Sequence, residues 1–203
     1  MPGRLLLGIG AYLYLTAGFF IITTFMIGYV TNTLKGSAGP LLTAITIGAA
    51  MQVLVVLISG RIADRIGAGR TIIIGYLITL VGAFPLFWMI DTKDPRWMTV
   101  GMLLALGLGS VAYAPIGALF RQLFPGRLLV SSMALSNNIG SLVSGFMPTI
   151  ATFVLVATAG RSWGPALLLF SIAGISLTSS IVIWRLVERE KALGGADVTV
   201  KEK

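Results

Sequence analysis

The side chains best able to do chemistry in this sequence are uncharged polar groups set in long apolar stretches. Asn137 and Asn138 stand side by side in one such stretch, and Gln52, Tyr113 and Tyr12 stand in three others. An amide or a phenol offers hydrogen-bond donors and acceptors, and its burial in hydrocarbon without a partner costs several kcal/mol. These five side chains therefore either line a polar cavity that accepts a substrate or bond neighbouring helices to one another.

Acidic residues are scarce, and all seven lie outside the apolar stretches: Asp64, Asp91, Asp94, Glu188, Glu190, Asp197 and Glu202. The chain has no His and no Cys. An ionisable group inside a membrane span is by default functional, and proton-coupled carriers usually need one. Any proton-binding group must therefore reside on another polypeptide or segment. Because no nucleophile constellation, phosphate-binding loop or metal-ligand cluster is visible, we expect neither an enzyme nor a bound metal or cofactor.

One basic segment, residues 60–70 with the sequence GRIADRIGAGR, holds the single acid of its region. We interpret it as a turn between two helices that contains Gly60, Asp64, Arg65, Gly67 and Arg70. Gly60 is expected to let the two helices meet closely. The carboxylate accepts charge-assisted hydrogen bonds, and the arginines anchor the turn to lipid headgroups.

The composition requires a membrane environment for this chain. Its 203 residues are 56% hydrophobic and only 11% charged, and the mean hydropathy is +0.94. A bilayer core about 30 Å thick needs roughly 20 apolar residues per helix. Six stretches meet that length: about 5–30, 41–60, 71–90, 97–120, 131–157 and 164–186. We predict an all-α membrane protein with one six-helix bundle over residues 1–190 and a disordered cytoplasmic tail over 191–203.

The basic residues favour an orientation with both termini in the cytoplasm. With that orientation, 11 of the 15 Lys and Arg residues fall inside and 4 fall outside, namely Lys35, Lys93, Arg96 and Arg161. Such a bias over short loops sets orientation in the bilayer. Because the charges are spread over the turns and not gathered on one surface, the formal net charge of +8 is not interpreted as a nucleic-acid site.

The segment G-x-x-x-D-R-x-G-x-x-R over 60–70 resembles the signature loop of the major facilitator superfamily. A second stretch, residues 113–127 continued by 131–135, resembles the region around the tenth and eleventh helices of the metabolite:proton symporters in that superfamily. The resemblance implies a gating role for these residues: Gly60, Asp64, Arg65, Gly67, Arg70, Arg121 and Arg127. The resemblance aligns the chain with helices seven to twelve of a twelve-helix carrier. It implies half of that fold, an inverted three-plus-three repeat.

The resemblance implies proton-coupled uptake of a small organic acid or zwitterion across a bacterial inner membrane. The expected partners are the lipid bilayer, the substrate, and an N-terminal-half chain or a second copy. Departures from the family pattern at Gln122, Leu129, Asn137 and Asn138 leave the substrate open. The alternative is a non-transporting truncated product or a small membrane scaffold, in which the polar residues serve only packing.

The resemblance also directs attention to the single acid of the basic segment. We expect the carboxylate of Asp64 to lie near Arg121, Arg127 or the start of the fifth helix, where backbone N–H groups favour an anion.

Overall fold

A computed structural model describes the backbone of residues 2–124 and 126–201 and the side chains of residues 3–124 and 126–190. Five helical segments in it are long and apolar enough to cross a membrane, and a bent pair of helices makes a sixth. No strand occurs in the described ranges. The predicted all-α bundle is therefore confirmed, with the spans Gly3–Thr33, Ala38–Ile66, Ala68–Asp91, Pro95–Leu123, Gly126–Ala157 and Trp163–Glu190.

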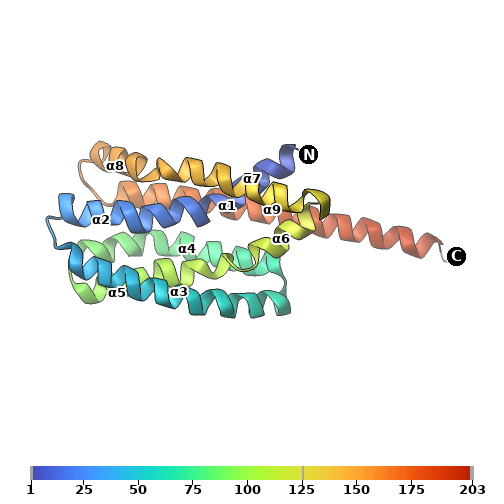
Figure 1. Ribbon diagram of the computed structural model, residues 1–203, viewed down its shortest axis with the longest axis horizontal. Coiled ribbons are helices and arrows are strands. Elements are labelled where there is room, and N and C mark those ends of the chain that lie inside the picture. Colours follow the sequence, from blue (N-terminus) through green and yellow to red (C-terminus); the bar gives the residue numbers. More distant parts are fainter. Residues whose placement is uncertain (1, 125, 202–203) are drawn as a thin grey trace.

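The spans are packed side by side with both chain ends at the same end of the bundle (Figure 1). Helices α4 (Ala68–Asp91) and α9 (Trp163–Lys201) pack against each other, and α9 also packs against α1 (Pro2–Leu13). Helix α3 (Ala38–Ile66) packs against the fourth span and has only 17% of its apolar window buried, compared with 39% for α4 and for α9. Among these three helices, α3 leaves the largest share of its surface to be covered by something else.

The first span is not a uniform α-helix. After α1 it contains three π-helical segments, Tyr14–Gly18 (η1), Ile21–Phe25 (η2) and Tyr29–Thr33 (η3), with the short helix α2 (Met26–Gly28) between the last two. A π-helical turn is rare and is often found at functional sites because it changes which face a side chain occupies. Here the change places both Tyr14 and Ala17 in the core.

The fourth span is equally irregular. It begins as α5 (Pro95–Met102), continues as the π-helical η4 (Leu103–Gly107) and the 3₁₀-helical η5 (Leu108–Ala112), turns at residues 113–115 and ends as α6 (Ile116–Leu123). Pro115 has no N–H to donate to a carbonyl one turn earlier, so the regular ladder ends before it. The amide of Leu119 then donates to the Pro115 carbonyl at 3.1 Å, which starts α6.

The fifth span is bent, whereas the sequence predicted one continuous helix over 131–157. Helix α7 (Gly126–Gly145) and helix α8 (Met147–Ala157) meet at an angle of 40°. The cause is local: Gly145 weakens the helix, and Pro148 cannot donate a hydrogen bond to the preceding turn.

The basic segment 60–70, which was predicted to be a turn, is helical except at one residue. Helix α3 runs to Ile66 and α4 begins at Ala68, so the connection is Gly67 alone, with φ of 95°. Its amide donates to the Ala63 carbonyl at 2.9 Å and closes α3. Only glycine adopts this backbone conformation without strain.

The end of the chain also differs from its prediction. Helix α9 continues to Lys201, through the segment expected to be disordered, and extends beyond the bundle in Figure 1. Glu, Lys, Ala and Leu, which are frequent just after the membrane span, are good helix formers, so the backbone continues the helix already started in the bilayer.

The first and fifth spans run parallel and contact each other through small residues. A Cβ at Gly8 would lie 2.9 Å from the Ser136 hydroxyl, and a Cβ at Gly140 would lie 3.3 Å from the Thr16 hydroxyl. One turn further on, Ser144 bonds Thr16 at 2.7 Å between the two hydroxyl oxygens. Close approach of small residues with hydroxyl bonds between them is the packing chemistry that membrane helices use.

Candidate functional site

Two of the polar residues predicted from the sequence meet in one pocket. Gln52 of α3 and Tyr113 of the fourth-span turn both line a depression of about 20 Å³. The other lining residues come from the two irregular spans: Tyr14, Leu15, Phe19, Ile22, Ala105, Leu106, Gly109 and Ser110. The volume is about that of one water molecule. This surface is therefore an open polar wall and not a closed chamber that could hold a larger molecule.

The irregular backbones explain why these residues converge. The π-helical turn of η1 buries Tyr14 against the fourth span, where a Cβ at Gly109 would lie 3.1 Å from the Tyr14 hydroxyl. The break at residues 113–115 exposes 45% of the Tyr113 side chain on the same wall as the half-buried Gln52.

A group of tyrosines lies behind this wall. Tyr14 and Tyr76 meet edge to face with ring centroids 5.8 Å apart, and the Tyr76 hydroxyl donates to the Ala11 carbonyl. Tyr12 packs edge-on against Phe120 at 5.2 Å, and its phenol interacts electrostatically with that of Tyr113. Of the two adjacent candidates in the first span, Tyr14 lines the pocket, and Tyr12, which was chosen from the sequence, stands beside it.

The two adjacent amides of the fifth span are exposed and do not line this pocket. Asn137 and Asn138 take part in none of the hydrogen bonds within the described side chains, and the same holds for Gln52. Their neighbour Ser136 is fully buried, and its hydroxyl has no protein partner. The amides therefore do not bond neighbouring helices of this bundle, which was one of the two roles considered for them.

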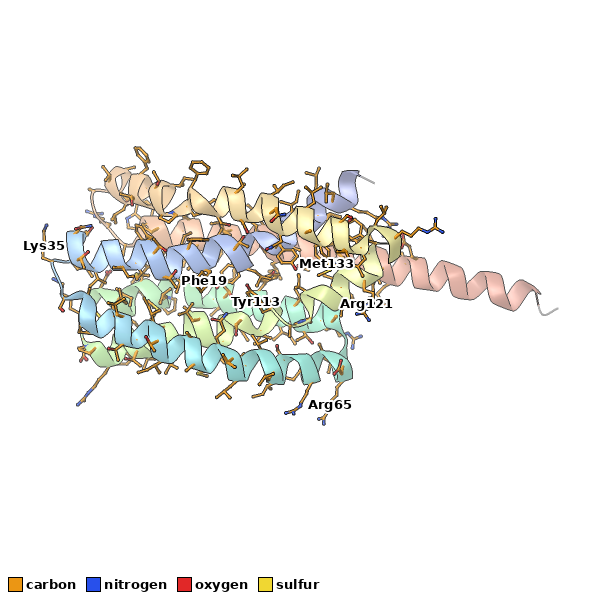
Figure 2. The ribbon with its side chains drawn as sticks, in the orientation of Figure 1. Phe19, Lys35, Arg65, Tyr113, Arg121 and Met133 are labelled. Atoms are coloured by element: carbon orange, nitrogen blue, oxygen red, sulfur yellow. The ribbon has the colours of Figure 1, made fainter. Side chains whose placement is uncertain are left out.

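Sequence reasoning missed Phe19 and Ser110 as lining residues. Ser110 precedes Tyr113 by three residues, which is the spacing of one helical face and was the only available signal. In Figure 2, Phe19 and Tyr113 lie midway along the bundle, whereas Arg65 and Arg121 lie at one end and Lys35 at the other. The charged side chains labelled there thus mark the ends of the spans, and the pocket lies between them.

The basic segment forms a second, polar cavity at the end of the bundle that holds both termini. Asp64, Arg65, Gly67 and Arg70 line it, and its volume is about 410 Å³. The remaining lining residues are Ile66, Ala68, Gly69, Gln122, Trp184 and Glu188.

Asp64 was expected to lie near Arg121, Arg127 or the start of the fifth helix, and an ion pair is the closest form that such a contact could take. Asp64 forms none with Arg121 or Arg127 among the described side chains, and neither arginine lines the cavity. Because α3 continues to Ile66, the exposed carboxylate stays on its last turn, and Gln122 is the α6 residue that shares its cavity.

Gly69, and not Gly60, is the residue that allows helices to meet closely in this segment. A Cβ at Gly60 would find only Ala114 at 3.8 Å, which is ordinary contact, whereas a Cβ at Gly69 would overlap the indole of Trp184 and lie 2.8 Å from its Cγ atom. The role expected for Gly60 therefore belongs to Gly69, which brings α4 against α9.

Substitution at these two glycines is expected to give opposite results. Gly69→Ala forces Trp184 to move and should lower the free energy of unfolding by about 1–3 kcal/mol, the usual cost of overpacking. Gly60→Ala gains helix propensity and should be neutral or slightly stabilising. Denaturant titration in detergent measures both, and a changed Trp184 emission should accompany Gly69→Ala alone. Equal stability of the two variants would contradict this assignment.

Neither cavity contains a set of metal ligands, since no group of three or more His, Cys, Asp or Glu side chains lies together in the part of the chain that the structure describes. The arrangement is a membrane bundle with an uncharged polar wall at mid-depth and a basic segment at one end.

A family model, "Major Facilitator Superfamily", matches residues 4–201. The chain belongs to the major facilitator superfamily. It is 26% identical over 180 residues to the glycine betaine/proline/ectoine/pipecolic acid transporter OusA of Dickeya dadantii (strain 3937), which covers 87% of this chain and 35% of that protein.

Two further relatives come from Escherichia coli (strain K12). The proline/betaine transporter is 24% identical over 188 residues, covering 91% of this chain and 37% of that protein. The shikimate transporter is 24% identical over 187 residues, covering 90% and 42%. No solved structure matches.

The chain thus spans between about a third and two fifths of the length of these relatives, which fits half of the superfamily fold. This major facilitator chain is accordingly a multi-pass membrane protein.

Proposed function

We propose that this chain is the C-terminal half of a secondary carrier that takes up a small zwitterion or organic acid across a bacterial inner membrane, with both termini in the cytoplasm. The observation that carries the proposal is the set of amides at membrane depth, Gln52, Asn137 and Asn138, which the bundle leaves without protein hydrogen bonds. A scaffold whose polar residues served only packing would have satisfied them.

The exposed surfaces support a partner in the membrane. Helix α3 presents an apolar face with Val53, Leu54 and Leu57 each more than 60% exposed, and α8 presents Phe153 at 72%. The pocket wall with Gln52 and Tyr113 holds about one water molecule. A second six-helix half, from another chain or a second copy, would supply the opposite wall and cover the amides.

The chemistry of the wall favours a zwitterion over a free anion. Its polar groups are an amide, a serine hydroxyl and two phenols, and it contains no cation to neutralise a carboxylate. Amide and hydroxyl groups donate to a carboxylate, while the faces of Tyr113 and Phe19 attract an ammonium group. The names of two relatives give betaine and proline as substrates, and both of these molecules are zwitterions.

Proton coupling, on this proposal, depends on the partner half. Within the described side chains, the acids Asp64, Asp91 and Asp94 lie in the last turn of α3 or at the ends of α4 and α5, and none lies at mid-depth. A proton-binding group has to be at that depth to exchange with both sides. The partner half is the remaining place for it.

Reconstitution tests the proposal directly. Proteoliposomes that contain this chain together with the N-terminal six-helix half of the Escherichia coli proline/betaine transporter, or with the half encoded beside it, should accumulate labelled glycine betaine or proline under an inward proton gradient. The chain alone should show no uptake. Absence of uptake of any zwitterion or organic acid with every N-terminal half would overturn the carrier function.

A further inference from the structure

A third cavity, beside the pocket that contains Gln52, opens on the side of the bundle formed by α4. It has a volume of about 460 Å³ and is lined almost entirely by apolar side chains. Eight of its lining residues belong to α4 between positions 77 and 86, and the others are Tyr14, Ile22, Leu104, Ala105 and Leu169. We call this cavity the α4 groove.

The α4 groove exists because the middle of α4 lacks side-chain volume. A Cβ at Gly82 would find no atom within 4 Å, so the space beside it is open. Pro85 follows within the same helix and has no N–H for the carbonyl of Val81. The rim carries Val81, which is 72% exposed, and Leu77, which is 44% exposed.

The polar atoms on the floor of the groove are already bonded. The Thr79 hydroxyl donates to the Gly75 carbonyl at 3.1 Å, and it interacts with the neighbouring Tyr14 hydroxyl. No unpaired donor or acceptor is left on the floor for a polar ligand. A cavity of this character stays free of water and takes hydrocarbon.

The depth of the groove places it in the hydrocarbon region. Helix α4 ends at Asp91, and Leu86 and Leu77 lie about 7 Å and about 21 Å along the axis from that end, at 1.5 Å per residue. The apolar core is about 30 Å thick. The exposed Trp88, Trp97 and Trp163 mark the interface at the same end of the bundle. The groove is therefore continuous with the lipid-facing surface of α4.

We propose that the α4 groove binds one acyl chain of a bilayer phospholipid. Its volume is that of a small-ligand site, whereas a helix from a partner is about 10–12 Å wide with its side chains. The chain would lie beside Gly82 and reach the Tyr14 side chain, which also lines the pocket with Gln52. This site does not depend on the proposed transport function.

The test is photolabelling of the full chain in nanodiscs of phosphatidylethanolamine and phosphatidylglycerol with a trace of phosphatidylcholine that carries a diazirine in mid-chain. Labelled peptides are compared between the groove, residues 77–86, and the exposed face of α3, residues 53–58. Each nanodisc is loaded with a single chain and no partner half, so this α3 face contacts bulk lipid and serves as the reference. In the unaltered chain, groove labelling should saturate as the probe fraction rises, while α3 labelling should rise linearly. Linear labelling at both places would overturn the proposal.

Filling the groove should displace the lipid. Gly82→Leu, or the more flexible Gly82→Met, should lower groove labelling about tenfold and leave α3 labelling unchanged. Gly126→Leu is the matched control, because Gly126 also has no neighbour within 4 Å but lies at the start of α7, away from the groove. Unchanged groove labelling in both Gly82 variants would contradict the assignment.

A partner helix at the same place would give a different result. The chain contains no cysteine, so Val81→Cys introduces a unique thiol on the rim of the groove. On our proposal, this variant stays monomeric under oxidation. Efficient disulfide-linked dimers, together with loss of groove labelling, would assign the groove to a second copy and refute the lipid site.

Discussion

Replacing Gly75 with Ala is expected to separate α4 from the fourth span and to destabilise the bundle more than any other Gly→Ala change considered above. A Cβ at Gly75 would lie 2.7 Å from the backbone nitrogen of Ala112 and 3.2 Å from the carbonyl carbon of Val111. Backbone atoms cannot rotate away as a side chain does, so the two helices must move apart. We expect a loss of about 3 kcal/mol or somewhat more, at the upper end of overpacking costs.

The matched control lies in the same helix. Gly82→Ala meets no atom within 4 Å and should be neutral or stabilise by up to about 1 kcal/mol, because alanine restricts the unfolded chain more than glycine does. Thermal unfolding in detergent, followed by the monomer peak in size-exclusion chromatography, compares the two variants. If Gly75→Ala unfolds with the same midpoint as Gly82→Ala, the close contact between α4 and η5 is not present in the protein.

The second large effect concerns transport. In the carrier reconstituted with its N-terminal half, Gln52→Leu should reduce the kcat/KM of zwitterion uptake about tenfold or more. The amide is the only one on the pocket wall, and the loss of a hydrogen bond to a charged group costs about 1.5–3 kcal/mol. Tyr113→Phe should have a smaller effect, because the ring face that attracts an ammonium group is retained.

Folding and transport must be separated in this experiment. Asn32→Leu is the control, since it also replaces an exposed amide of the same chain but does so outside the pocket that contains Gln52. All three variants should show unaltered unfolding curves, because neither Gln52 nor Asn32 has a protein hydrogen bond to lose. Unchanged uptake by Gln52→Leu would remove this wall from the substrate path while leaving the carrier function intact.

Much of the architecture could be predicted because the bilayer constrains it so strongly. Six apolar stretches of membrane length can hardly form anything but helices, since every backbone polar group has to be satisfied inside hydrocarbon. One turn was also predictable: the connection between α3 and α4 falls within residues 60–70, as the sequence indicated, although it is limited to Gly67. These are local properties of a residue and its immediate neighbours.

Boundaries and faces were harder to predict, because they depend on contacts between distant segments. The bend at Gly145 was missed because one apolar stretch runs through it without a change in composition. Tyr14 replaced Tyr12 as the lining residue because π-helical turns rotate the first span, and hydrophobic periodicity assumes a regular helix. Asp64 forms no ion pair with Arg121 or Arg127 among the described side chains and shares its cavity with Gln122, because α3 continues past Asp64.

The sequence by itself determined that this protein is an α-helical membrane bundle of the major facilitator type, with no acid at mid-depth and a basic segment at one end. Composition and span length are sufficient for the helical membrane bundle, because the cost of burying charge and unpaired backbone in lipid excludes other folds. The superfamily was indicated separately, by the resemblance of the motif over residues 60–70. The tertiary structure decided at which glycines helices contact each other closely, which polar residues line the same pocket and where the bundle contains cavities. Those properties depend on which atoms of separate helices come within a few ångströms of one another.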